Sequence, residues 1–84
     1  MEIDINKDYS VLCEYYSNYR NWGHKAHLFK NGVKIDTIKI VYCNRTWERY
    51  QFESVLVAFA YRLDERYKEI PLKDRIAFYN KIKE

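Results

Sequence analysis

The sequence has few of the residues that interrupt regular structure, with two glycines and one proline among its 84 residues. This scarcity excludes a collagen-like chain or a flexible linker, and the 48% hydrophobic content excludes an intrinsically disordered chain. No apolar run approaches the roughly 20 residues that span a bilayer. The first residues lack the basic and apolar segments of a signal peptide. We therefore expect a single soluble domain over residues 1–84, located in the cytoplasm, with no membrane partner.

Residues that carry metal or nucleophilic chemistry are also sparse. Cys13 and Cys43 lack a secretory context and are expected to be buried free thiols. A zinc site would have to combine them with His24 and His27, but positions i and i+3 of a strand point to opposite faces. A Cys–His nucleophilic pair stays open on spacing alone, although so short a chain has little room for a substrate cleft. We predict no enzyme activity, no catalytic residue, no cofactor and no metal.

Charge and aromatic content say more about partners. Lys and Arg number 15 against 12 Asp and Glu, and residues 10–50 hold seven bases and only three acids. Aromatic residues make up 18% of the chain, and nine of them are tyrosines. Tyrosine has an apolar body and a polar tip, so it suits both a small core that reaches the surface and a binding face.

Three segments show strand character. Residues 10–19 are rich in β-branched and aromatic types, and residues 21–23, which include Gly23, are expected to form a loop after them. Asn31-Gly32 separates residues 24–30 from residues 33–42 and predicts a hairpin, because both central residues of a type I′ turn need positive φ.

The turn predicts the pairing of the hairpin. A two-residue loop places His27 opposite Asp36 and gives an apolar face formed by Ala26, Leu28, Val33 and Ile35. The next apolar residues are out of phase with this face, so we expect a β-bulge, one extra residue near Asp36-Thr37. Beyond the bulge the expected pairs are Ala26–Ile38 and Lys25–Lys39.

The remainder of the chain has helical periodicity. One apolar stripe predicts a helix that begins between Thr46, a candidate N-cap, and Gln51 and ends near Tyr67; it consists of Phe52, Val55, Leu56, Phe59 and Leu63. Pro71 suits the first turn of a second helix that runs through Lys83, with a stripe of Leu72, Ile76, Tyr79 and Ile82. This order predicts an α+β fold, in which a three-stranded antiparallel sheet containing the Asn-Gly hairpin is followed by two helices packed on one face.

The sheet face away from the helices is the candidate binding surface, because it and its margins interleave bases with aromatic residues. That pattern suits phosphates and stacked bases, and equally a protein interface; a solvated lysine face is the third reading. Trp47 either anchors the strand-to-helix corner or is an exposed contact. The candidate partner-binding residues are Arg20, Trp22, Lys25, Phe29, Lys34, Lys39, Arg45, Trp47 and Arg49.

Residues 44–53, Asn-Arg-Thr-Trp-Glu-Arg-Tyr-Gln-Phe-Glu, follow the hairpin and lead into the first helix. Together with the chain from Asn31-Gly32 to Leu56, of which it is the centre, this stretch resembles small proteins from phages and other bacterial mobile elements, in which a strand hairpin runs into an NRTWE turn and then an amphipathic helix. Accessory phage proteins of this size commonly bind and block host defence proteins, the anti-CRISPR proteins being one kind. The resemblance implies a non-enzymatic protein-binding module in the bacterial cytoplasm that occludes a host protein, such as a nuclease or a nucleoprotein complex.

The expected architecture is also similar to that of plant AP2 domains and the arm-binding domains of tyrosine recombinases, which read DNA with a three-stranded sheet. This similarity implies the alternative function, in which the sheet binds DNA or RNA through Lys25, Lys34, Lys39, Arg45 and Arg49. Homodimerisation through the sheet or its edge strands stays open.

Overall fold

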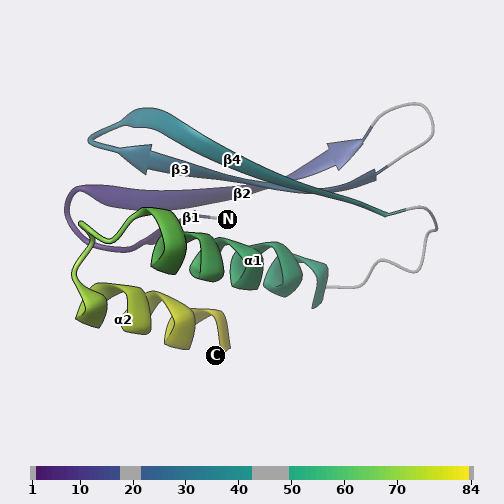
Figure 1. The fold of residues 1–84 in the computed structure, drawn as a ribbon. Coiled ribbons are helices and arrows are strands. Elements are labelled where there is room, and N and C mark those ends of the chain that lie inside the picture. Colours follow the sequence, from purple (N-terminus) through teal and green to yellow (C-terminus); the bar gives the residue numbers. More distant parts are fainter. Residues whose placement is uncertain (1, 18–21, 43–49, 84) are drawn as a thin grey trace.

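The structure, a computed structural model, describes residues 2–17, 22–42 and 50–83. It confirms an α+β fold in which both helices lie on one side of an antiparallel sheet (Figure 1). The strands follow one another in the sheet in the order β1-β2-β3-β4. The elements are β1 (Glu2–Asp4), β2 (Tyr9–Ser17), β3 (Trp22–Lys30), β4 (Val33–Tyr42), α1 (Tyr50–Arg66) and α2 (Leu72–Lys83).

The sheet has four strands, which corrects the expected three. The additional strand, β1, is three residues long and has a single apolar residue, Ile3, so it shows no periodicity in the sequence. Ile3 pairs with Val11 of β2. The turn between the two strands is closed by Asn6, whose Oδ1 accepts hydrogen bonds from the backbone N–H groups of Asp8 (2.8 Å) and Tyr9 (2.9 Å).

The Asn-Gly hairpin is confirmed, since Asn31 (φ 52°) and Gly32 (φ 83°) both have the positive φ of the expected turn. The expectation that Trp22 and Gly23 belong to a loop is wrong, because β3 begins at Trp22. Gly23 lies inside β3, opposite Val41 of β4. A Cβ atom at this position would collide with the backbone carbonyl of Ile40, so the close approach of these two strands requires glycine here.

A β-bulge interrupts the β3–β4 ladder, as predicted, but it lies slightly closer to the turn. Phe29 pairs with Lys34 and Leu28 with Asp36, so Ile35 is the extra residue. The expected pairing of His27 with Asp36 is therefore wrong, because Asp36 lies opposite Leu28 and His27 lies opposite Thr37. Past the bulge the ladder follows the predicted register, with the pairs Ala26–Ile38 and Lys25–Lys39.

Asp36 gives a physical reason for the position of the bulge. Its carboxylate faces the helices, where Oδ1 accepts a hydrogen bond from Arg62 Nη1 (3.1 Å) and Oδ2 accepts one from the Tyr67 hydroxyl (2.9 Å). Oδ1 also accepts the backbone N–H of Thr37 (2.8 Å). A bulge after Asp36 would have turned this carboxylate to the opposite face and left Arg62 and Tyr67 without it.

The core lies between the sheet and the helices. The stripe of α1 is confirmed at Val55, Leu56, Phe59 and Leu63, all buried. The side chain of Phe52 and the candidate cap Thr46 lie outside what the structure describes. On the sheet, Ala26 and Leu28 are fully buried, whereas Val33 and Ile35 are exposed and correct the expected apolar face. Val33 adjoins the turn, and Ile35 is the bulged residue.

The second helix begins directly after Pro71, whose carbonyl oxygen accepts hydrogen bonds from the N–H groups of Asp74 (2.9 Å) and Arg75 (3.1 Å). Its predicted stripe is wrong in part. Tyr79 and Ile82 are half-buried against the core, but Leu72 and Ile76 are exposed, and the residue that fills the core is Phe78.

Removing the aromatic ring of Phe59 should largely unfold the domain. Phe59 is fully buried in the middle of α1, and Phe59→Ala should cost about 3–5 kcal/mol of a total stability of about 5 kcal/mol. Lys34→Ala, on the opposite side of the sheet, should leave the Tm nearly unchanged. Thermal unfolding followed by circular dichroism measures both; a parental Tm for Phe59→Ala would show that α1 is not docked as described.

Asp36, Arg62 and Tyr67 form a hydrogen-bonded cluster, and a variant that removes more of its hydrogen bonds should lose more stability. Tyr67→Phe deletes one hydrogen bond and should cost about 0.5–1.5 kcal/mol. Asp36→Ala leaves two side-chain donors without their acceptor and should cost more, about 1–3 kcal/mol. Urea unfolding of both variants tests this order, and a smaller loss for Asp36→Ala than for Tyr67→Phe would contradict the arrangement.

Candidate functional site

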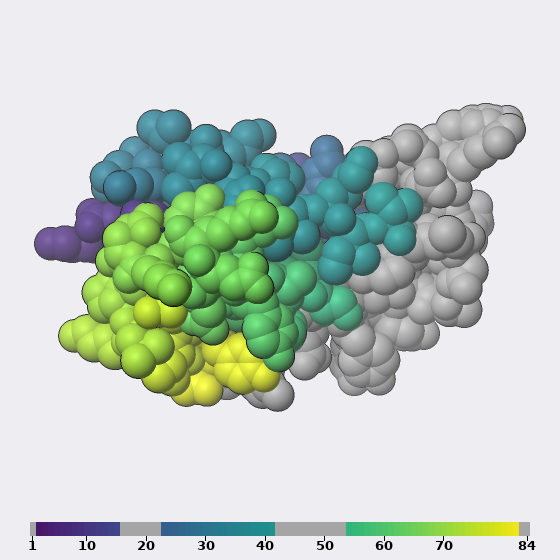
Figure 2. Space-filling view, in the orientation of Figure 1, coloured from purple at the N-terminus to yellow at the C-terminus, as the bar shows by residue number. Residues whose placement is uncertain are grey.

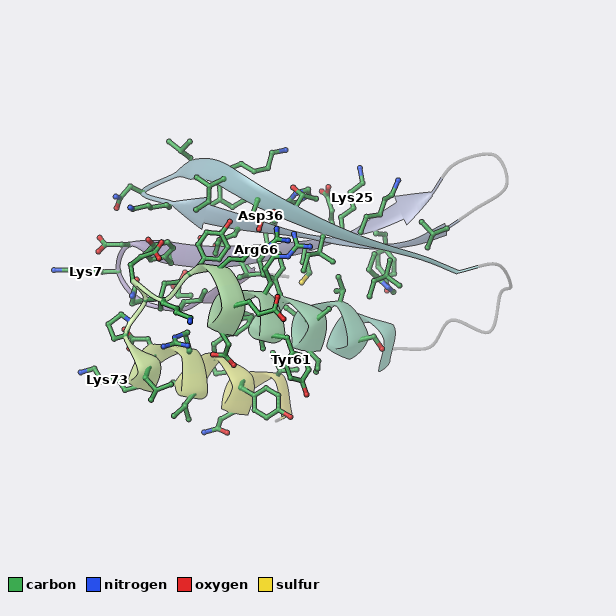
Figure 3. All side chains as sticks on the ribbon, viewed as in Figure 1. Lys7, Lys25, Asp36, Tyr61, Arg66 and Lys73 are labelled. Carbon is green, nitrogen blue, oxygen red and sulfur yellow. The ribbon has the colours of Figure 1, made fainter. Side chains whose placement is uncertain are left out.

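The sheet face that points away from the helices, here called the open face, carries most of the described candidate residues. The register places on it the residues that alternate with the buried ones along each strand. In Figure 3, Lys25 projects away from the helices, whereas Asp36 lies between the sheet and α1. The open face is formed by Glu2 and Asp4 (β1), Leu12 and Glu14 (β2), Lys25, His27 and Phe29 (β3), and Lys34, Thr37 and Lys39 (β4).

Four of the predicted binding residues therefore share one surface. Lys25 is directly opposite Lys39, and Phe29 is directly opposite Lys34, so the four form two cross-strand pairs on β3 and β4. Trp22 is the first residue of β3. The remaining predicted residues lie outside the described part of the chain: Arg20, Arg45, Trp47 and Arg49.

Charge on the open face divides by strand. The β3–β4 half carries Lys25, Lys34 and Lys39, and the β1–β2 half carries Glu2, Asp4 and Glu14. Between the halves lie the half-buried Leu12 and Phe29 and the buried ring of His27. The open face is thus a surface with an apolar and aromatic centre and opposite charges on its two sides.

A hydrogen-bonded array crosses three strands at this centre. His27, on β3, is only 6% exposed. Its Nε2 lies 2.9 Å from Oε1 of Glu14 on β2, and its Nδ1 lies 2.9 Å from Oγ1 of Thr37 on β4. The ring of Phe29 packs edge-on to the imidazole with centroids 6.5 Å apart. The array therefore ties β2, β3 and β4 together from the solvent side.

The charge of Glu14 determines the directions of these hydrogen bonds. The hydrogen bond from His27 lowers the pKa of Glu14 below its ordinary value, and the positive charges of Lys25 and Lys34 act in the same direction. An ionised carboxylate can only accept, so Nε2 of His27 donates to Glu14. In the neutral imidazole Nδ1 then carries the lone pair, and the Thr37 hydroxyl donates to it.

This order of hydroxyl, imidazole and carboxylate is the one that activates nucleophiles in hydrolases, but its first effect here is to orient three side chains on a sheet. Thr37 was not expected in this array, because the predicted register pairs His27 with Asp36 and puts the extra residue of the bulge near Asp36-Thr37. Only the position of the bulge brings Thr37 next to His27. The alternation of polar residues along each strand was the available signal, but it does not specify cross-strand partners.

The two histidines lie on opposite faces of β3, as strand geometry requires. His24 is 1% exposed on the covered face, and its ring lies against that of Tyr15 with centroids 5.0 Å apart. Burial lowers the pKa of His24, so its ring is neutral near pH 7. The described residues contain no group of three or more His, Cys, Asp or Glu side chains placed to hold a metal ion.

Cys13 is buried beside the core, as predicted, while Cys43 lies outside the described residues. Burial raises the pKa of the Cys13 thiol to about 11, which keeps it protonated near neutral pH. The thiolate is the nucleophilic and metal-binding form, so Cys13 serves as a small apolar side chain of the core.

A second surface lies on the far side of the helices. A groove of about 220 Å³ runs between α1 and α2, which adjoin on the face shown in Figure 2. We call it the helix groove; it is lined by Ala60, Tyr61, Asp64, Leu72, Arg75, Ile76 and Tyr79. Arg75 Nη1 donates to Asp64 Oδ1 across it at 2.7 Å. The groove was not expected from the sequence, because the apolar stripe of the second helix predicts that Leu72 and Ile76 are buried, whereas both are exposed.

Comparison with other proteins found no match for this chain. No protein-family model matches the chain, and neither curated proteins nor solved structures match it. Among the described residues, no helix has the length and apolar character needed to cross a membrane. The open face and the helix groove are therefore the features of the molecule that bear on its function.

The buried His24 should make the domain less stable in mild acid. Because the pKa of His24 is lowered from 6.5 in the folded state, the unfolded chain takes up a proton first. The contribution to stability is complete above pH 6.5 and is lost as the pH falls toward the folded pKa. The lowered pKa of Glu14 affects stability in a separate pH range, below the ordinary pKa of 4.5 for this group.

His24→Phe keeps a buried ring but removes the titrating group, so its stability should vary less with pH in that first window. Urea unfolding of both proteins at a series of pH values measures the difference. An equal slope in the two proteins would mean that His24 does not titrate as its burial requires.

Proposed function

We propose that this protein is a non-enzymatic binding module that recognises another protein through the open face of its sheet. The observation that carries the proposal is the division of charge on that face, with lysines over β3–β4, carboxylates over β1–β2 and Phe29 and Leu12 between them. Protein interfaces combine an apolar or aromatic centre with a charged rim, and complementary charges on the rim set the orientation of the partner.

The array at the centre of the open face supports this function. Side chains that are already held in one conformation lose less entropy when a partner binds. His27 is held by Glu14 and Thr37 and packs against Phe29, so the centre of the surface is ordered in the free protein.

The partner in this proposal is a host defence protein of a bacterium, which the module inhibits by covering its working surface. This part rests on the resemblance of residues 31–56, centred on residues 44–53, to proteins of phages and mobile elements. An anti-CRISPR type of action needs only tight binding at a functional surface, which an 84-residue chain can supply.

Nucleic-acid binding is the second candidate, favoured by the three lysines that share the β3–β4 half of the open face. The carboxylates of Glu2, Asp4 and Glu14 on the same face repel phosphates, which limits the contact to that half. Binding through three lysines would make the logarithm of the affinity for duplex DNA fall with the logarithm of the salt concentration with a slope of about −3.

Affinity capture with matched variants tests the protein partner. The full chain is immobilised and exposed to nuclease-treated lysate of a candidate host, in parallel with Lys34→Glu and with Lys68→Glu. Both lysines are exposed, but Lys34 is on the open face and Lys68 follows α1. We expect one stoichiometric protein with the parent and with Lys68→Glu, and at least about tenfold less with Lys34→Glu. The purified partner should lose activity when one equivalent of the module is added.

Two results would contradict the proposal. Capture that is equal for Lys34→Glu and Lys68→Glu would exclude the open face. Binding of purified nucleic acid with the salt dependence given above, together with loss of all protein capture after nuclease treatment, would support the second candidate.

A further inference from the structure

The helix groove is lined by several exposed apolar side chains. Three of its large side chains are more than half exposed, Tyr61 (63%), Leu72 (59%) and Ile76 (51%). Tyr61 projects from the outer side of α1 in Figure 3, and the other two come from α2. Exposed apolar side chains that line one groove together, and are not scattered singly, make that groove a candidate interaction site.

The charges beside the groove differ from one helix to the other. On the α1 side, Glu65 is exposed close to the end of the helix, whereas the neighbouring Asp64 is already paired with Arg75 of α2. On the α2 side, Lys73 is exposed close to its start, and it projects outward in Figure 3. Because the short segment 67–71 joins the two helices, these acidic and basic residues lie at the same end of the groove.

This arrangement is complementary to itself. A two-fold axis parallel to the groove places α1 of each copy against α2 of the other and keeps the same ends together. Glu65 of one copy then faces Lys73 of the other, and Tyr61 comes level with Ile76 of the other copy. A two-fold axis across the middle of the groove would instead bring α1 against α1 and α2 against α2 with their ends exchanged, so Glu65 would not face Lys73.

We propose that the occupant of the helix groove is a second copy of this chain, and that the protein forms a two-fold dimer through a four-helix layer. The dimer buries Tyr61, Leu72 and Ile76, and it leaves both open faces exposed on opposite sides. Each dimer then presents two open faces, so binding a partner that displays repeated sites gains from effective concentration. The dimer stands independently of the proposed function, because the two surfaces lie on opposite sides of the molecule.

Sedimentation velocity of the full chain over a range of roughly micromolar concentrations tests the dimer. We expect a concentration-dependent shift from monomer to dimer. Ile76→Glu should weaken the dimer at least about tenfold, because it places a charge in the apolar centre. Ile76 is exposed, so the variant should fold; circular dichroism checks this, and Tyr61→Glu replaces it if it does not. Val33→Glu, at an equally exposed apolar position on the sheet, is the matched control and should dimerise like the parent.

Charge reversal tests the two-fold arrangement. Glu65→Lys and Lys73→Glu should each weaken the dimer roughly twofold to fivefold, and the double variant should recover the parental affinity. A chain that sediments as a monomer throughout, or a dimer that Ile76→Glu leaves intact, would overturn the proposal. A double variant weaker than either single variant would reject the pairing of α1 with α2.

Discussion

The β-bulge at Ile35 is the local feature on which both faces of the sheet depend. Side chains alternate along a strand, so one extra residue moves everything beyond it to the other face. Because the bulge precedes Asp36, that carboxylate turns toward α1 and meets Arg62 and Tyr67. The same shift turns Ile38 toward the core. The single bulged residue thus lets the strand keep the register set by the Asn-Gly turn near the turn, while the apolar residues beyond the bulge still face the core.

The open face owes its chemistry to the same shift. Thr37 reaches His27 only in the shifted register, and Glu14 completes the array from the neighbouring strand. Glu14, His27 and Thr37 come from three different strands, so no short sequence motif predicts that they meet. The hydrogen bonds hold an imidazole in one orientation at the centre of a surface whose charge is divided. A surface with these properties discriminates between partners by orientation as well as by affinity.

A domain of this size can bury only a small core, and the chain fills that core with large aromatic side chains. Aromatic side chains fill the core at Phe59 and Phe78, while tyrosines with a polar tip lie where the core meets solvent. The hydroxyl of Tyr9 donates to Glu69 at 3.3 Å, and that of Tyr67 donates to Asp36. Some apolar side chains lie outside the core, on the outer side of the helices, where Tyr61 and Ile76 are exposed.

The sequence by itself determined the hairpin, the strand and helix order, the buried stripe of α1 and the shared face of Lys25, Phe29, Lys34 and Lys39, since these follow from turn chemistry and periodicity. It did not determine β1, because three residues carry no period. The exact position of the bulge depended on Asp36 meeting Arg62 and Tyr67, which are distant in the chain. The face of α2 that is buried depended on where Phe78 fits against α1. Tertiary structure decided these features because each depends on contacts between segments that are far apart in the chain. Local periodicity carries no information about such contacts.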